Sequence, residues 1–405
     1  MLDFRAAMKR VAVLLESSLE VARGILRGIA LYSKEHGGWI LDYTSGGLLA
    51  QRLPEGWRGD GIIARVPTER EAMRLVANRA PKVVMDPQRP FTEPGHPLSA
   101  MPRIICDNEA VGRLAAEHFL DCGFSTFAYA GPTLSSSVVG YGAWSDEPNW
   151  AEGRRVGYVR ALAKHGLAVH AYGGPRTRRM SENWNLEMPF VCQWLASLPK
   201  PVAVFSPHDV RARQISDACL AAGLAVPYSV AILGVNNDAT LCETSQPPLS
   251  SIPLDAERAG WMAAELLDGL MNGTAPPCRS IPYPPLPVAE RDSSANTQTD
   301  DPLVIGLLEE IRETKGFNLR VSELADRRRV TVRTLENHCR KALGRSVGDV
   351  IREACLSNVH ALVADTDIPF AEIARRCGQL SASHLAAAFR RRYGTTMTEV
   401  RHPRA

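Results

Sequence analysis

The sequence contains no long apolar run. Across its 405 residues, no stretch approaches the roughly 18 uninterrupted apolar residues of a membrane-spanning helix. The apolar run nearest the N-terminus, Val11 to Leu15, ends at Glu16 and is shorter than the apolar segment of about 7 to 15 residues in a secretory signal. We therefore predict that this run is a first β-strand, that the protein does not enter a membrane, and that it stays in the cytoplasm.

Clustered cysteines and the common catalytic motifs are also missing. The nine cysteines are widely spaced and form no CxxC pair, which argues against a disulfide framework and against a zinc site, so we expect buried free thiols. The sequence has no phosphate-cradling GxxxxGK and no HExxH metal motif. We accordingly expect no enzymatic activity, no cofactor and no bound metal ion.

The net charge is small but unevenly distributed. The whole chain carries +3. Residues 303–405 hold 18 Lys and Arg against 12 Asp and Glu, whereas residues 1–302 have more acidic than basic side chains. A basic C-terminal part favours contact with a polyanion such as a nucleic acid.

A chain of this length is expected to fold as two or three domains, because domains typically have about 100 to 200 residues. The clearest boundary is AERDSSANTQTDDP at 289–302, a polar and acidic stretch without apolar periodicity. We assign residues 1–292 to a first domain, residues 293–302 to a linker and residues 303–405 to a second domain.

Before the boundary, short apolar runs alternate with helical patterns. Seven runs have the composition of β-strands: RVAVLLE, DGIIARV, KVVMD, RIICD, FAYAG, PVAVFS and SVAILGV. This alternation predicts an α/β fold of doubly wound parallel sheets with helices on both faces. Such sheets bind ligands beyond the carboxyl ends of their strands. After the boundary only helical patterns remain, so the second domain is predicted to be all-α.

Four segments of the first domain carry a family resemblance. They are IICDNEAVGRLAAEHFLDCGFSTFAYAGP (104–132), NWAEGRRVGYVRALAKHGL (149–167), VAVFSPHDVRARQISDACLAAGLAVPYSVAILGVNND (202–238) and PPLSSIPLDAERAGWMAAELLDGLMNG (247–273). In order and spacing, over most of residues 9–292, they resemble the sugar-binding domain of the LacI/GalR regulators, which is akin to periplasmic binding proteins for sugars. The resemblance implies two α/β lobes with a small polyol between them.

The resemblance also implies ligand-binding positions. These are Arg154, the Arg of an R-x-x-G pair, with His208, Asp209 and Asn236 at strand ends, and Trp150 is a candidate stacking face. Such groups suit a sugar, whose hydroxyls both donate and accept hydrogen bonds. Asn236 stands where the family has Asp, which leaves the identity of the sugar open. Two alternatives remain: Asp209 caps the following helix, and Trp150 only packs.

The second domain contains two helix-turn-helix patterns on either side of a long helix near Val347 to Val363. In the first, a helix leads through a turn at Arg329 to a second helix that Thr331 caps. In the other, Gly378 makes the turn and Ser381 caps the second helix. We predict that the second helix of each pattern is a recognition helix.

This doubled arrangement resembles the AraC/XylS DNA-binding domain, on the strength of IA..CG before the second recognition helix and F.R.YG after it. The resemblance covers about the last hundred residues. The chain departs from the family at Gln379, Leu385 and Met397, where an aromatic residue, Phe and Pro are usual. We expect these changes to loosen the packing of that helix without removing the pattern.

In such domains the exposed face of each recognition helix enters the major groove. The predicted DNA-binding residues are Arg333, Glu336, Asn337 and Arg340 of the first helix, and Ser381, Ser383, His384 and Arg390 of the second, which also presents Ala382 and Ala387. Because the alanines leave few groups for bases, we expect the second helix to supply mainly backbone affinity, thymine-methyl contact or shape readout. The alternative is an ordinary helical bundle with a solvated charged face.

The two parts together resemble the xylose-responsive subgroup of the AraC/XylS regulators. The resemblance implies a sugar-responsive transcription activator, dimeric through its first domain, with promoter DNA, a pentose such as xylose and RNA polymerase as partners. Sugar would close the two lobes and change how the dimer places its recognition helices. A regulator whose first domain has lost sugar binding and serves only for dimerisation is the alternative, and a sugar enzyme is disfavoured by the missing motifs.

Overall fold

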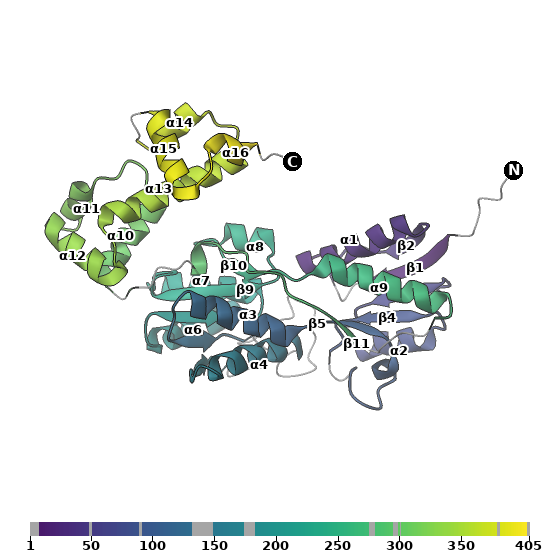
Figure 1. Cartoon of the computed structure of the whole chain (residues 1–405). Coiled ribbons are helices and arrows are strands. Elements are labelled where there is room, and N and C mark those ends of the chain that lie inside the picture. Colours follow the sequence, from purple (N-terminus) through teal and green to yellow (C-terminus); the bar gives the residue numbers. More distant parts are fainter. Residues whose placement is uncertain are drawn as a thin grey trace. The chain divides into compact units, whose positions relative to one another are not determined.

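The computed structural model describes residues 8–47, 51–88, 91–131, 149–173, 183–274, 280–294, 299, 301–378 and 381–402. The chain divides into two compact units, residues 1–296 and 297–405, each described here by itself (Figure 1). Within the described ranges, no helix is both long enough and apolar enough to cross a bilayer. The eight cysteines in these ranges are free thiols, and Cys278 lies outside them.

Two parallel β-sheets form the first unit, one in each of two lobes. The first lobe has the strand order β11-β5-β4-β3-β1-β2, and the second lobe has β10-β9-β8-β6-β7. The strands are β1 (Lys9–Leu14), β2 (Trp39–Tyr43), β3 (Gly61–Ala64), β4 (Lys82–Met85), β5 (Arg103–Cys106), β6 (Phe127–Tyr129), β7 (Val169–Ala171), β8 (Val202–Phe205), β9 (Val230–Val235), β10 (Ser250–Ile252) and β11 (Ser280–Tyr283). The predicted α/β fold with parallel sheets is confirmed.

All seven apolar runs are strands, namely β1, β3, β4, β5, β6, β8 and β9. The apolar pattern does not predict β2, β7, β10 and β11. Each of these four lies at an edge of its sheet, and β2, β7 and β11 carry mostly exposed or half-buried side chains. The fourth, β10, is buried but begins with two serines, so its composition resembles a turn.

Helices cover the two sheets. They are α1 (Glu20–Glu35), α2 (Glu69–Ala77) and α9 (Ala256–Met271) in the first lobe, and α3 (Asn108–Asp121), α4 (Asn149–Ala163), α6 (Trp184–Ser197), α7 (Asp209–Ala221) and α8 (Ala239–Thr244) in the second. In the first lobe, α9 packs on β3, β4, β5 and β11, and α1 packs on α9. In the second, α3 packs on α4, and α7 packs between α6 and β9.

Paired glycines bring two pairs of helices into close contact. A Cβ on Gly112 of α3 would lie 1.9 Å from a backbone oxygen of α4, and one on Gly157 of α4 would lie 2.1 Å from a backbone oxygen of α3. Gly28 of α1 and Gly260 of α9 meet in the same way, at 1.9 and 2.0 Å. The glycine of the R-x-x-G pair is therefore required by helix packing, since no side chain fits between these backbones.

The chain crosses between the lobes three times: from β5 to α3, from β10 to α9, and from β11 to the short 3-10 helix Asp292–Ser294. Two isolated antiparallel bridges hold the second and third crossings together, between Ser251 and Ala289 and between Leu254 and Pro285. The second and third crossing segments therefore lie side by side.

The third crossing ends in a fixed anchor on the second lobe. Ser293 is fully buried, where its Oγ accepts from Ser250 N at 2.8 Å and donates to Ile232 O at 2.7 Å. The Oγ of Ser294 hydrogen bonds with His118 Nε2 at 2.8 Å. The linker predicted at residues 293–302 therefore contains two residues that pack inside the second lobe, which a small polar composition does not reveal.

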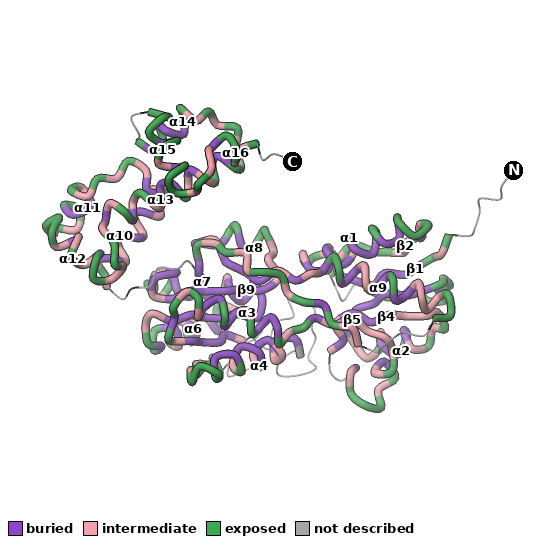
Figure 2. The backbone as a smooth tube through the Cα atoms, in the orientation of Figure 1, coloured by how far each residue is buried: buried purple, intermediate pink, exposed green. Residues whose placement is uncertain are grey.

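The second unit consists of seven helices within the described residues. They are α10 (Pro302–Glu313), α11 (Val321–Arg327), α12 (Val332–Leu343), α13 (Val347–Asp365), α14 (Phe370–Arg376), α15 (Ala382–Tyr393) and α16 (Met397–Arg401). Along these helices, buried positions alternate with half-buried and exposed ones (Figure 2). Leu385 and Met397, two of the three departures from the family pattern, are buried in the core of the second half, and Gln379 lies outside the described residues.

We predict that Gly157→Ala lowers the free energy of unfolding by about 2 kcal/mol, because the added methyl group forces α3 and α4 apart. The measurement is chemical denaturation of the full chain. Gly269→Ala is the matched control: it also lies inside a helix, but its Cβ would have no neighbour nearer than 3.7 Å, so it should stabilise by up to about 1 kcal/mol. Equal effects of the two changes would contradict the close-packing argument.

Candidate ligand cleft and nucleic-acid interface

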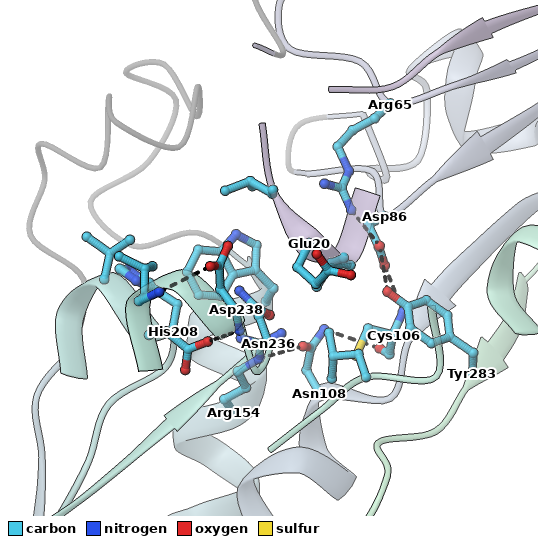
Figure 3. Close-up of a pocket in the computed structure, with 17 residues that line it drawn as sticks. Glu20, Arg65, Asp86, Cys106, Asn108, Arg154, His208, Asn236, Asp238 and Tyr283 are labelled. Carbon is cyan, nitrogen blue, oxygen red and sulfur yellow. Dashed lines mark hydrogen bonds and ion pairs between the residues drawn. The ribbon is translucent and has the colours of Figure 1, made fainter. Parts of the chain in front are cut away.

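A cavity lies between the two lobes, at the carboxyl ends of both sheets (Figure 3). From the first lobe it is lined by Leu19, Glu20, Val21, Arg65, Asp86, Cys106 and Tyr283, and from the second by Asn108, Trp150, Arg154, His208, Asp209, Val210, Asn236, Asp238 and Leu241, with Leu254 on a crossing segment. All five residues that the sequence predicts as ligand contacts line this one cavity. Whether they bind a ligand stays a prediction.

Arg154 brings a buried positive charge to the cavity. Its Nε donates to Asn108 Oδ1 at 3.0 Å, its Nη1 donates to Pro207 O, and its guanidinium lies 5.0 Å from the centre of the Trp150 ring. The side chain is 4% exposed, and it forms no ion pair with any residue that the structure describes. A buried cation that has no ion-pair partner retains its attraction for an electron-rich ligand atom.

His208 presents an unused hydrogen-bond donor. It caps α7, where its Nδ1 accepts from Arg211 N at 3.1 Å. The hydrogen of the neutral ring must then lie on Nε2, and this buried atom has no partner among the described residues. Burial lowers the pKa of His208 to about 3, and the charges of Arg154 and Arg211 act in the same direction. The ring is therefore neutral and offers one N–H.

Asp209 connects the start of α7, the loop after β9 and strand β10 at the end of the second sheet. Its Oδ1 accepts from Ser251 Oγ at 2.6 Å and its Oδ2 accepts from Asp238 N at 2.8 Å. Burial raises the pKa of Asp209 to about 7, although these hydrogen bonds act in the opposite direction. The alternative that Asp209 caps α7 is wrong, because His208 holds that position. Glycine is required at Gly234, where a Cβ would lie 2.3 Å from Asp209 Oδ1.

Asn236 follows β9 with a left-handed backbone, at φ 105°. Its N–H donates to Ile252 O at 2.9 Å, so the loop is fixed while the side chain lines the cavity. The amide forms no hydrogen bond with another described residue. It is therefore free to donate to or accept from a ligand, which the Asp that is usual in the family does only as an acceptor.

The first lobe contributes a polar group that the sequence analysis misses. Asp86 Oδ2 accepts from Arg65 Nη2 and from Tyr283 OH, both at 2.9 Å, and its Oδ1 accepts from Cys106 N at 2.7 Å. Arg65 Nη1 donates in turn to Glu16 Oε1 at 2.6 Å. Asp86 and Arg65 directly follow the runs KVVM and GIIA, so the rule that ligands bind beyond strand ends would have found them.

The first recognition helix, α12, keeps an outward face with free polar groups. Arg333, Asn337 and Arg340 are exposed, and Arg333 and Asn337 form no hydrogen bond or ion pair with other described residues. Glu336 differs from its predicted outward position. It is half-buried, its Oε2 accepts from Val347 N at 3.4 Å at the start of α13, and it lies 3.7 Å from Arg340 Nε.

The second recognition helix, α15, is exposed along the side opposite Leu385 and Phe389. Its exposed predicted residues are Ser383, His384, Ala387 and Arg390. Ser381 Oγ accepts from His384 N at 3.3 Å, so this hydroxyl caps the helix. Ala382, predicted to face outward, is half-buried and packs against the core of the second half instead.

Most arginines of the second unit are paired with carboxylates, but those at the centre of the two recognition faces are not. The arginines with a carboxylate partner include Arg327, Arg328, Arg340, Arg345, Arg352, Arg375, Arg376 and Arg392. Arg333 of α12 and Arg390 and Arg391 of α15 have no such partner within the described ranges. Both helices that the sequence assigns to DNA therefore carry positive charge that no carboxylate of the described residues pairs with.

Comparison with known proteins finds relatives of both units. A family model described as a periplasmic binding protein-like domain matches residues 116–294, and one described as a helix-turn-helix domain matches residues 324–402. The xylose operon regulatory protein of Haemophilus influenzae is 28% identical over 300 residues, 74% of this chain and 74% of that protein. Its Escherichia coli counterpart is 27% identical over 345 residues, 85% of this chain and 84% of that protein.

One solved structure is similar over the whole chain. The xylose-binding transcription activator XylR has 25% sequence identity to this chain and a TM-score of 0.79, and the match covers 98% of each chain. The order of a two-lobed unit followed by a doubled helix-turn-helix unit is therefore shared with a known protein from end to end.

The raised pKa of Asp209 predicts a pH effect on stability. An Asp in the unfolded chain ionises near pH 4, whereas Asp209 in the folded protein stays protonated to about pH 7. Between about pH 4 and pH 7, Asp209 therefore ionises in the unfolded chain but not in the folded protein, and this ionisation stabilises the unfolded state. The contribution of Asp209 to the free energy of unfolding falls as the pH rises through this range, by up to about 1.4 kcal/mol per pH unit. Below pH 4 and above pH 7 the contribution is constant.

The test compares urea denaturation of the wild type and Asp209→Asn at pH 5, 6 and 7. The difference in unfolding free energy, wild type minus variant, should fall as the pH rises through this range. A difference that rises with pH would mean that the donors from Ser251 and Asp238 keep the folded carboxylate ionised.

Proposed function

The chain is a transcription regulator of the AraC/XylS family that carries a periplasmic-binding-protein-like sugar-binding domain, and from this premise we propose that it binds a pentose in the cavity between its lobes. The observation that carries the proposal is the lining of that cavity, where Arg154 has no carboxylate partner and where His208 Nε2 and the Asn236 amide have no hydrogen-bond partner among the described residues. The relatives are transcription regulators, and we propose no catalytic activity for this chain.

The cavity suits an uncharged polyol better than a sugar phosphate or a sugar acid. Its lining carries two cationic side chains, Arg65 and Arg154, against four carboxyl groups: Glu20, Asp86, Asp209 and Asp238. The carboxyl groups outnumber the cationic side chains, so the cavity would repel an anionic ligand. A pentose meets the same groups with hydroxyls that both donate and accept. The relatives named above regulate a xylose operon, which supports xylose as the first ligand to test.

The alternative of a sensor domain that has lost its ligand is not favoured. Loss of ligand binding would leave no reason for a buried arginine without a carboxylate partner or for a buried imidazole N–H without an acceptor. The replacement of Asp by Asn at 236, which motivated this alternative, keeps hydrogen-bonding capacity at the cavity.

Ligand-driven closure of the lobes is supported by one ion pair across the cavity. Arg23 of α1 lies in the first lobe, and its Nη2 is 3.9 Å from Asp238 Oδ2 in the second. The same guanidinium donates to Glu20 Oε2 at 2.8 Å and to Ser17 O at 2.9 Å. A longer, half-exposed contact of this kind is weak, so we propose that the bound sugar supplies most of the free energy that favours the closed state.

The second unit is proposed to bind two successive turns of the major groove. The helix α13 separates the two recognition units and has 19 residues, a length of about 28 Å. One turn of B-DNA is about 34 Å, so a spacer of this size supports recognition helices in adjacent turns on one face of the duplex. The proposed DNA contacts are Arg333, Asn337, Arg340, Ser383, His384 and Arg390. Ser381 caps the second recognition helix, and Glu336 lies beside Arg340, so we propose that these two residues position the contacts.

Dimerisation through the first unit, activation of transcription with RNA polymerase and a cytoplasmic location complete the proposal. These points rest on the family. In the proposed mechanism, sugar-bound and sugar-free dimers hold their recognition helices in different arrangements, and the sugar shifts the population by as much as its affinity for the two states differs.

We predict that Arg154→Met weakens xylose binding at least tenfold, because hydrogen bonds from a charged group contribute about 1.5 to 3 kcal/mol. Isothermal titration calorimetry of the full chain gives the affinity. Arg160→Met is the control, since Arg160 lies on the same helix but is exposed and pairs with Glu109; its affinity should match the wild type. An absence of heat from wild-type protein with xylose, arabinose and ribose alike would contradict the sugar-binding proposal.

We predict that Arg333→Ala and Asn337→Ala each weaken binding to the promoter fragment of the protein's own gene about 10- to 100-fold. Binding to random-sequence DNA should change much less, because base contacts carry the discrimination. Fluorescence anisotropy at fixed salt measures both. Arg375→Ala is the control, because Arg375 lies on α14 and is paired with Glu372. Equal losses on both DNAs would mean that α12 contacts only the backbone.

A further inference from the structure

The first turns of α12 leave few side chains free to meet DNA. Thr331 Oγ1 accepts from Thr334 N at 3.1 Å, and the two threonine hydroxyls hydrogen bond to each other at 2.8 Å. His338 is engaged as well, because its Nδ1 lies 2.6 Å from Asp301 Oδ2. With Glu336 turned to α13, the outward side chains that remain free on this part of the helix are Val332, Arg333 and Asn337.

Val332 is the unexpected member of this set. It is 43% exposed, and among the described residues of the second unit it is the one large apolar side chain that is exposed. The other large apolar residues of α12, Leu335 and Leu343, are buried or half-buried. The exposed apolar group therefore lies at the first residue of the recognition helix, directly after the Thr331 cap.

Neither helix formation nor core packing accounts for a valine here. Valine is a weaker helix former than most polar residues with unbranched side chains, and at 43% exposure the isopropyl group keeps much of its surface in water. The N-terminal residues of a recognition helix are, however, those that approach base edges in the major groove. The apolar feature that a base edge offers there is the 5-methyl group of thymine.

We propose that Val332 contacts the 5-methyl group of a thymine and so determines part of the DNA sequence that this regulator selects. The inference rests on the proposed function, since it needs α12 to lie in the major groove. It assigns three complementary features to one helix: an apolar contact from Val332, a forked donor from Arg333 that suits guanine, and an amide from Asn337 that suits adenine. The second recognition helix presents only alanines as exposed apolar groups.

The experiment removes the methyl group from the DNA. The full chain first selects its preferred duplex from random-sequence DNA, and each thymine of that duplex is then replaced singly by deoxyuridine. Affinities of the wild type, Val332→Ala and Leu220→Ala are measured for every duplex. Ala favours the helix more than Val, and Leu220→Ala, at a 75% exposed leucine of the first unit, controls for the loss of a surface apolar group.

One or two uracil substitutions should weaken wild-type binding about fourfold, as expected for a lost methyl contact. The same substitutions should leave the DNA affinity of Val332→Ala unchanged, while Leu220→Ala should lose affinity for the same duplexes as the wild type. The proposal is overturned if every uracil substitution affects wild type and Val332→Ala equally. It is also overturned if Val332→Ala lowers transcription from the promoter without changing any DNA affinity, since Val332 would then meet a protein.

Failure of the proposed function gives a different result. A full chain that selects no sequence from random DNA would overturn DNA recognition as a whole, and this inference with it. A chain that selects a sequence strongly but shows no uracil effect that depends on Val332 would overturn this inference alone.

Discussion

Two acidic side chains, Asp86 and Asp209, fix the edges of the cleft, and the rest of the site depends on them. Asp86 follows β4 and accepts hydrogen bonds from groups on β5, on β11 and just after β3. Asp209 follows β8 and accepts from Ser251 of β10 and from the loop after β9. In each lobe both carboxyl oxygens accept hydrogen bonds from donors at neighbouring strand ends, and these bonds hold the strand ends together. Arg154, His208 and Asn236 are therefore presented by walls that are already rigid.

The sequence predicts the fold and half of the cleft because both follow from local patterns. Buried central strands give continuous apolar runs, and the residues after them point to the ligand edge. The role of Asp209 could not be predicted in this way. His208 and Asp209 are both at the start of α7, and each residue type can cap a helix. The choice is made by Ser251, 42 residues away in sequence, which offers Asp209 a stronger partner in space.

The same limit appears in the second unit. Helical periodicity places Glu336 on the outer face of α12. In the structure the start of α13 lies beside this face, and Val347 N donates a hydrogen bond to the Glu336 carboxylate. Periodicity describes one helix, whereas burial depends on which helix arrives next to it. Leu385 and Met397, which stand where Phe and Pro are usual in the family, show the opposite case, in which the pattern does predict burial. Both are apolar and fill the core, at 1% and 3% exposure, so volume and hydrophobicity suffice where identity has changed.

The path from the cleft to the DNA-binding helices can be followed along the chain. The third crossing segment is bridged to the second at Leu254 and Pro285, beside the cavity, and it ends in the buried serine anchor on the second lobe. Only residues 295–300 separate this anchor from Asp301, which caps α10 and contacts His338 of α12. In the proposed mechanism, a change in the crossing segments thus has a short covalent route to the first recognition helix, while the second recognition helix follows α13 and lies farther along the chain. Sugar should therefore act first on the helix whose free side chains are best suited to discriminate between bases.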